Sequence, residues 1–333
     1  MGTVSASDEL PHTVEGDGQW SESYYFNLYD PAAALGAFTR IGVRPNEGTM
    51  DVGLSIFLPD GGFVHVRHKK PQHANTADLE VGGVRYEMVQ PLERWRITYD
   101  GPSHSIGSAR DASRREAWEK SRLERLTVDL TFDALHPPAG AGGDRTAAPS
   151  EAAESAARGV AKGHFEQAGR WSGSIWVSGD EYSIAGYGNR DKSWGVRNWQ
   201  APRMWRWFSL NFGDDCAMGA VRLLMSDSDV HRGWIHRDGR NVSVRHIDLR
   251  TETEPGGYLQ RRLELTLTDA EGRRHVIQGE LLQVAPLAQS RDGRRTVVCE
   301  GLARFRYEGR EGYGIAEYLH QLDDAGQPIV TVE

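Results

Sequence analysis

Residues 186–199, GYGNRDKSWGVRNW, form the densest run of reactive side chains in the chain. The charged members with possible roles in chemistry are Arg190, Asp191 and Arg197, and the aromatic members are Tyr187, Trp194 and Trp199. A carboxyl group facing an apolar cavity would have a raised pKa and could donate a proton. Protonation of an alkene leaves a carbocation, which indole and phenol faces stabilise. The run therefore predicts acid–base chemistry on a hydrophobic substrate.

The same residues also fit a structural role. Arg190, Asp191 and Arg197 could form an ion-paired knot that closes one end of a barrel, because buried charge persists only when it is paired and hydrogen-bonded. Trp194 and Trp199 would then pack over the knot as a plug. The sequence leaves both interpretations open.

Two more acids lie among aromatic residues. Glu317 sits in the apolar run 313–319, and Glu22 shares a predicted strand face with Trp20 and Tyr24, since these residues are two apart. We therefore predict Asp191, Glu317 and Glu22 as candidate acid–base residues. The candidate substrate contacts are Tyr24, Tyr187, Trp194, Trp199, Arg190, His164 and Trp205. His164 could relay a proton, although simple exposure fits its position as well.

Several familiar motifs are absent. The sequence contains no GxxxxGK[ST] phosphate loop, no GxSxG elbow and no HExxH pair. Residues 186–191 imitate the start of a dinucleotide fingerprint but lack its third glycine. His65 and His68 are three apart in an apparent strand and would face opposite sides. We expect neither a metal nor a cofactor.

Charge and cysteine usage exclude several classes of partner. The 39 Lys and Arg residues against 47 Asp and Glu residues give a net charge of -8, which does not attract nucleic acid or an anionic membrane surface. The polar start and the lack of a long apolar run predict a soluble protein without stable membrane insertion. Cys216 and Cys299 form no CxxC pair, which fits a cytoplasmic location. The oligomeric state stays open, a homodimer included.

Hydrophobic periodicity indicates β structure. In residues 126–132, LTVDLTF, every second residue is apolar, as in a strand with one buried face. Pairs such as Asp60-Gly61 and Asp238-Gly239 separate similar runs and favour tight hairpin turns. Residues 111–124 are rich in helix formers and predict either a short surface helix or a mobile loop.

A small and polar stretch divides the chain. Residues 137–162 carry almost no large apolar group, so they predict a linker between residues 1–136 and residues 163–333. Each flank holds enough strands for a closed antiparallel barrel, which removes exposed sheet edges. We therefore predict an all-β fold of two consecutive β-barrels with few short helices; two β-sandwiches are the alternative.

Four segments together resemble a known family. The central run resembles the "G-x-G-x-R-D-H-S-W-G-x-R-x-W" signature of proteins related to carotenoid 1,2-hydratase, also called hydroxyneurosporene synthase. The supporting segments are WSESYYF at 20–26, HFEQ at 164–167 and GYGIAEY at 312–318. The resemblance implies two lipocalin-like barrels and a hydrophobic ligand. One departure is Lys192, where the signature has histidine.

The resemblance implies more than one function, because a shared fold hosts different activities. We expect a cofactor-independent lyase, hydratase or cyclase that acts on an isoprenoid, steroid or aromatic alkene by acid–base catalysis. The alternative is a non-catalytic carrier or sensor of a lipid or terpenoid. A scaffold for a partner protein is a third hypothesis.

Overall fold

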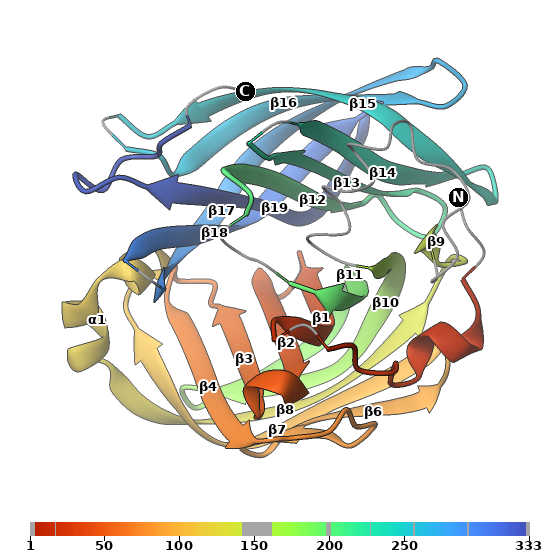
Figure 1. The fold of residues 1–333 in the computed structure, drawn as a ribbon. Helices are drawn as coiled ribbons and strands as arrows, with labels where there is room; N and C mark the ends of the chain where they lie inside the picture. The colour runs from red at the N-terminus through yellow and green to blue at the C-terminus, as the bar shows by residue number, and fades with distance from the viewer. Residues whose placement is uncertain are drawn as a thin grey trace. The chain divides into compact units, whose positions relative to one another are not determined.

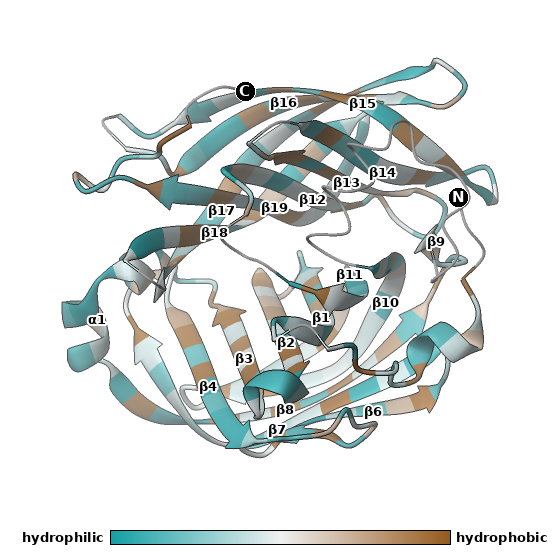
Figure 2. Cartoon of the chain, viewed as in Figure 1, coloured by the Kyte–Doolittle hydropathy of each residue, from teal (hydrophilic) through white to brown (hydrophobic). Residues whose placement is uncertain are grey.

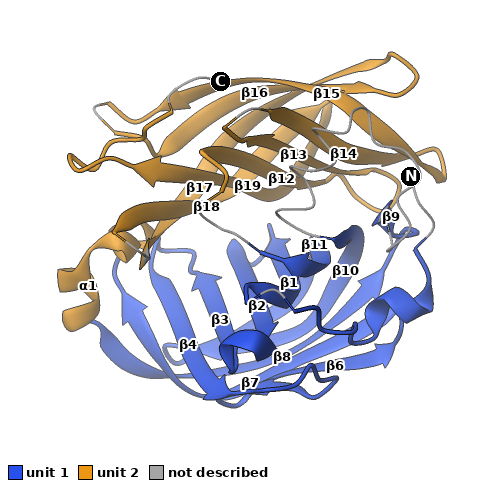
Figure 3. Ribbon diagram, in the orientation of Figure 1, with its two compact units in different colours: residues 1–107, 120–198 blue, residues 108–119, 199–333 orange. Residues whose placement is uncertain are grey.

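The computed structural model describes residues 4–16, 18–141, 162–197, 201–226, 228–255, 257–291 and 293–330. By its internal contacts the chain divides into two compact units (Figure 3). Unit 1 comprises residues 1–107 and 120–198, and unit 2 comprises residues 108–119 and 199–333. Within the described ranges, no helix has the length and apolar character needed to cross a membrane.

Unit 1 is built from antiparallel strands (Figure 1). They are β1 (Trp20–Asp30), β2 (Leu35–Arg44), β3 (Thr49–Phe57), β4 (Phe63–Pro71), β5 (Leu79–Val81), β6 (Val84–Gln90), β7 (Arg94–Ile106), β8 (Arg122–Ala134), β9 (Ala139–Ala141), β10 (Gly163–Val177) and β11 (Asp180–Val196). Their order is β4-β3-β2-β1-β11-β10-β8-β7-β6-β5, and β9 pairs with β10. An additional pairing of β4 with β7 joins the path into a ring and leaves β6 and β5 as an extension.

The ring of unit 1 includes strands from both sides of the expected linker. We expected residues 163–333 to form the second barrel, but β10 and β11 pair with β8 and β1 and complete the first ring. Of the expected linker, residues 142–161 lie outside the described residues, while β9 lies at its start and pairs with β10. The contacts therefore divide the chain near residue 198.

The core of unit 1 follows the period-two pattern of its strands. Leu126, Val128, Leu130 and Phe132 of β8 are all buried, as the alternation predicts. Figure 2 shows hydrophobic and hydrophilic bands alternating along strands of this unit. A strand with this pattern buries one face and leaves the other for polar groups. Neighbouring residues of one strand therefore lie on opposite faces of the sheet, and the residues of the signature run on β11 divide between the two faces in the same way.

Unit 2 contains a closed antiparallel barrel. Its strands are β12 (Met204–Asn211), β13 (Ala217–Leu224), β14 (Asp229–Arg237), β15 (Arg240–Thr253), β16 (Gln260–Asp269), β17 (Arg274–Arg291), β18 (Arg294–Tyr307) and β19 (Arg310–Leu322). The predicted turn at Asp238-Gly239 joins β14 to β15, and both residues have positive φ, 54° and 75°. Such angles belong to the tight turns that suit a twisted hairpin. The prediction of an all-β fold with β-barrels is confirmed.

The described helices are few and short. They are η1 (Ala6–Glu9), η2 (Pro45–Glu47), η3 (Ala109–Ser113) and α1 (Arg115–Glu119). The helix predicted as one alternative within residues 111–124 is present as α1, and β8 begins three residues after its end.

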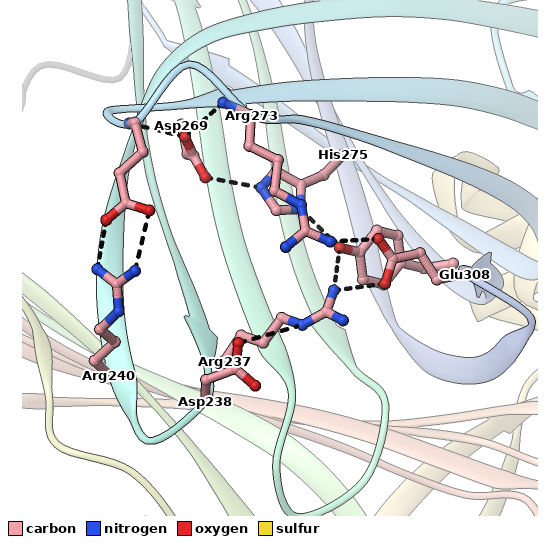
Figure 4. Close-up of polar contacts among 9 residues, drawn as sticks. Arg237, Asp238, Arg240, Asp269, Arg273, His275 and Glu308 are labelled. Carbon is pink, nitrogen blue, oxygen red and sulfur yellow. Dashed lines mark hydrogen bonds and ion pairs between the residues drawn. The ribbon is translucent and has the colours of Figure 1, made fainter.

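A polar cluster joins three turns at one end of the second barrel (Figure 4). His275 is buried, and its ring nitrogens bond to Asp269 at 3.0 Å and to the Tyr307 hydroxyl at 2.7 Å. Arg237 donates to the same hydroxyl at 2.8 Å and pairs with Glu308 at 2.5 Å. Because both nitrogens of His275 have partners, this cluster stabilises the turns without an unsatisfied group.

Candidate functional site

The signature run lies on β11, between β1 and β10. Its alternation turns Arg190 and Lys192 toward the core of unit 1 and Asp191 toward the opposite face. Gly188 faces the core, where a Cβ atom would lie only 1.8 Å from the Asn27 carbonyl oxygen. Trp199 lies outside the described residues. The proposed knot of Arg190 with Asp191 is therefore not formed, because the two side chains point to opposite faces of the strand.

The inner face holds a buried cluster of four charges. Lys192 Nζ pairs with Glu22 at 2.7 Å, and Arg190 Nη1 pairs with Glu9 at 2.7 Å. Arg190 also donates through Nε and Nη2 to Gln167 Oε1, at 2.9 and 2.7 Å. All four charged side chains are at most 2% exposed. Paired in this way, they meet the condition under which charge can be buried.

The N-terminal segment supplies part of this cluster. Glu9 accepts hydrogen bonds from the Leu92 amide and from Trp95 Nε1, at 3.0 and 3.1 Å. His12 bonds to Glu22 through its amide at 3.0 Å and through Nδ1 at 2.9 Å. The His12 ring stacks on Trp194 with centroids 3.8 Å apart. Residues before β1 thus supply a carboxylate and an imidazole to the buried cluster.

The buried carboxylate of Glu22 is not kept in its protonated form. Burial alone would raise the pKa of Glu22, but the hydrogen bond from His12 and the charge of Lys192 outweigh burial and lower the pKa to about 2. Burial and the charges of Glu22 and Glu9 raise the pKa of Tyr24. The protonated carboxyl group expected among aromatic rings is therefore not found at Glu22, since its ion pair favours the charged form.

The outer face carries a second cluster, made by β10 and β11. His164 Nε2 is hydrogen-bonded to Asp191 Oδ2 and lies 3.6 Å from Glu166 Oε1. Strand register places Glu166 directly opposite Asp191. Asn189 donates through Nδ2 to Glu166 Oε2 at 3.5 Å, while its own Oδ1 is buried and has no hydrogen-bond partner in the described ranges. A histidine and two carboxylates therefore converge on one small area of the sheet.

Electrostatics set the charge of the outer pair. Burial would lower the pKa of His164, but the charge and hydrogen bond of Asp191 and the charge of Glu166 outweigh burial and raise it. Burial would raise the pKa of Asp191, but His164, Arg197 and Arg40 together lower it. Both shifts favour the form of the pair in which His164 is an imidazolium and Asp191 a carboxylate, and in that form the group that can release a proton is His164.

The outer cluster also has the donor atoms of a metal site. One ligand atom from each of His164, Glu166 and Asp191 lies within 4.8 Å of the others. A cation would have to replace the hydrogen bond between His164 and Asp191. The positive charges of Arg197 and Arg40, which act on Asp191, would repel such an ion. Proton transfer fits this arrangement better than metal binding.

The remaining predicted residues lie elsewhere in the fold. Tyr187 shares the outer face of β11 with Asp191 but is four residues away, which is about 13 Å along a strand. In unit 2, Trp205 Nε1 donates to Glu317 Oε1 at 2.6 Å. Both lie on the face of β12 and β19 opposite the core residues Phe208 and Tyr318. Glu317 therefore does not project into the second barrel.

Sequence reasoning missed several residues of both clusters. Glu166 could have been found, because it is two residues from His164 and so shares its strand face. Asn189 could have been found in the same way, because it is two residues from Asp191 and shares its strand face. No sequence pattern pointed to Glu9 or His12. They precede β1, and only the folding of the chain brings them to Arg190 and Glu22.

A family model described as "Domain of unknown function (DUF7064)" matches residues 5–322. The chain belongs to this family. No curated protein matches the DUF7064 chain.

Solved structures share the architecture of this DUF7064 protein. An AttH-like protein from Nitrosomonas europaea has 14% identity and a TM-score of 0.62, with 90% of this chain and 92% of that chain covered. Kievitone hydratase from Nectria haematococca has 14% identity and a TM-score of 0.57, with 92% of each chain covered. CghA has 12% identity and a TM-score of 0.52, with 91% and 88% covered. At such identities these likenesses show a common fold, which is the tandem-barrel fold that the signature implies.

Proposed function

We propose that this protein is a cofactor-independent hydratase, lyase or cyclase that acts on a hydrophobic small molecule by proton transfer. The observation that carries the proposal is the hydrogen-bonded pair of His164 and Asp191 on β10 and β11. The similarity of fold to kievitone hydratase supports chemistry of the hydratase type. An isoprenoid, steroid or aromatic alkene is the substrate class that the signature run favours.

His164 would donate the proton. With Nε2 bonded to Asp191, the imidazolium still carries a proton on Nδ1, to which no described residue bonds. Transfer of the Nδ1 proton to an alkene carbon leaves a neutral imidazole whose remaining proton stays on the Asp191 hydrogen bond. Asp191 therefore fixes the tautomer and favours the charged form before transfer.

Glu166 would complete the proton balance. Water that adds to the carbocation must lose a proton, and the Glu166 carboxylate beside His164 would accept it. Exchange with solvent would then remove this proton from Glu166 and return one to His164 Nδ1, which restores the starting state. Asn189 Oδ1, which is buried and to which no described residue donates, would accept a hydrogen bond from that water. In the reverse direction the same groups would remove water from an alcohol.

Incubation with a panel of isoprenoid, steroid and aromatic alkenes in deuterated water tests this proposal. Mass spectrometry should show deuterium in the product with the natural protein and a loss of at least about 100-fold with His164→Gln, the typical range for removal of a general acid. His246→Gln is the control, since this histidine is exposed on unit 2. Unchanged incorporation by a folded His164→Gln variant would refute the mechanism.

A carrier of a lipid or terpenoid remains the alternative proposal. Native mass spectrometry of the purified protein distinguishes the two functions. A carrier retains a hydrophobic molecule and releases it unchanged, whereas the proposed enzyme alters it.

A further inference from the structure

The interior of the second barrel contains an unpartnered histidine. His320 lies on β19, two residues after Tyr318 and four after Ala316, so it shares the strand face of these core residues and its side chain points into the barrel. It is 5% exposed, and among the residues that the structure describes neither Nδ1 nor Nε2 has a hydrogen-bond partner. A buried polar group without a partner is rare in folded proteins, because it costs free energy to desolvate.

The surroundings of His320 combine aromatic rings with one positive charge. The Tyr258 ring lies 5.4 Å from the His320 ring, and the Tyr318 ring lies 6.3 Å from it. The Arg206 guanidinium is buried 4.2 Å from the centre of the Tyr318 ring. Burial first, and then the charge of Arg206, lower the pKa of His320 to about 3, so the imidazole is neutral.

A second unpartnered atom lies in the same interior. Gln260 is 1% exposed and donates through Nε2 to the carbonyl oxygens of Cys299 and Ala316, at 3.1 and 2.9 Å. Its Oε1 atom has no hydrogen-bond partner within the described part of the chain. The carbonyl of Ala316 lies four residues before His320 on β19, which is about 13 Å along the strand. Two polar groups, His320 and Gln260 Oε1, therefore lie in the interior without a hydrogen-bond partner among the described residues.

These unpartnered atoms define the chemistry of a ligand. A neutral imidazole offers one donor and one acceptor, and the amide oxygen of Gln260 adds another acceptor. A carboxylate could accept a hydrogen bond from the imidazole N–H, but it has no proton to donate to the other imidazole nitrogen or to Gln260 Oε1. A hydroxyl group both donates and accepts, and it brings no charge that burial would penalise.

We infer that the interior of the second barrel binds an apolar small molecule that carries a hydroxyl group, with His320 as its hydrogen-bond partner. The site involves neither His164 nor Asp191, so it stands independently of the proposed catalytic function. Tyr258 and Tyr318 would contact the apolar body of the ligand, and Gln260 would accept from a second donor further along the barrel.

Phenol, toluene and benzoate, three probes of similar size, test the inference. With the histidine rings isotopically labelled, NMR titration of the natural protein should show phenol shifting the His320 signals, with an affinity at least about tenfold above that of toluene, the worth of one hydrogen bond. Equal shifts with toluene, stronger binding of benzoate, or no shift with any probe would overturn the inference.

A matched pair of variants adds a second test. His320→Phe should abolish the preference for phenol over toluene without lowering the melting temperature, because it removes only an unsatisfied group. His236 is also 5% exposed, but its Nδ1 bonds to Asn241 Oδ1 at 2.7 Å. His236→Phe should therefore lower the melting temperature and keep the preference. Retention of the preference by His320→Phe would contradict the assignment.

Discussion

The buried pair of Glu22 and Lys192 predicts a specific response to acid. The pKa of Glu22 lies at about 2 in the folded protein, against an ordinary value of 4.5, which corresponds to about 3 kcal/mol of stability. Because the folded pKa is the lower one, this stability is present above pH 4.5 and is lost as the pH falls toward 2. Glu22→Gln keeps the shape of the side chain and removes this contribution.

Urea unfolding followed by tryptophan fluorescence measures the effect. At pH 7 we expect Glu22→Gln to lower the free energy of unfolding by about 3 kcal/mol, since Lys192 loses its carboxylate partner. Between pH 5 and pH 3 the gap between the two proteins should narrow. Asp129→Asn is the control, because its pair with Arg96 is about half exposed and solvent screens such a pair. A gap that stays constant down to pH 3 would show that Glu22 is not held in its charged form.

Three other outcomes follow from the structure. Glu9→Gln should lower the free energy of unfolding by about 3 kcal/mol in the same urea assay, since it leaves Arg190 without its carboxylate; a loss below about 1 kcal/mol would contradict the buried pair. Asp191→Asn should reduce deuterium incorporation by at least about 100-fold with little change in melting temperature, and full activity would contradict its role. Burial raises the pKa of Cys216 and Cys299, so iodoacetamide should modify neither thiol until the protein unfolds, as read by mass spectrometry; rapid labelling of the folded protein would contradict their burial.

Local patterns predicted the strands but not every pairing between them. The alternation in β8 and the Asp238-Gly239 turn are local signals, and both appear in the structure as expected. The place of β10 and β11 in the first ring depends on pairing with β1, more than a hundred residues away in sequence. A composition change at residues 137–162 does not report such long-range pairing.

In the candidate site, too, local periodicity predicts some features, while others depend on long-range contacts. Period two places His164 and Glu166 on one face, and it places Arg190 and Asp191 on opposite faces, so this part could be read from the sequence. The contact of Glu9 with Arg190 joins residues 181 positions apart, so the sequence pattern could not predict it. Nor could the sequence tell that Glu22 is paired, which reverses the expected direction of its pKa shift.

The proposed proton donor is a charged His164 held by Asp191, and the pKa of His164 tests it most directly. Titration of the His164 ring by heteronuclear NMR should give a pKa above the ordinary value of 6.5, and Asp191→Asn should lower it, because the carboxylate favours the imidazolium. A His164 pKa at or below 6.5 in the natural protein, or one that Asp191→Asn leaves unchanged, would contradict the proposed acid.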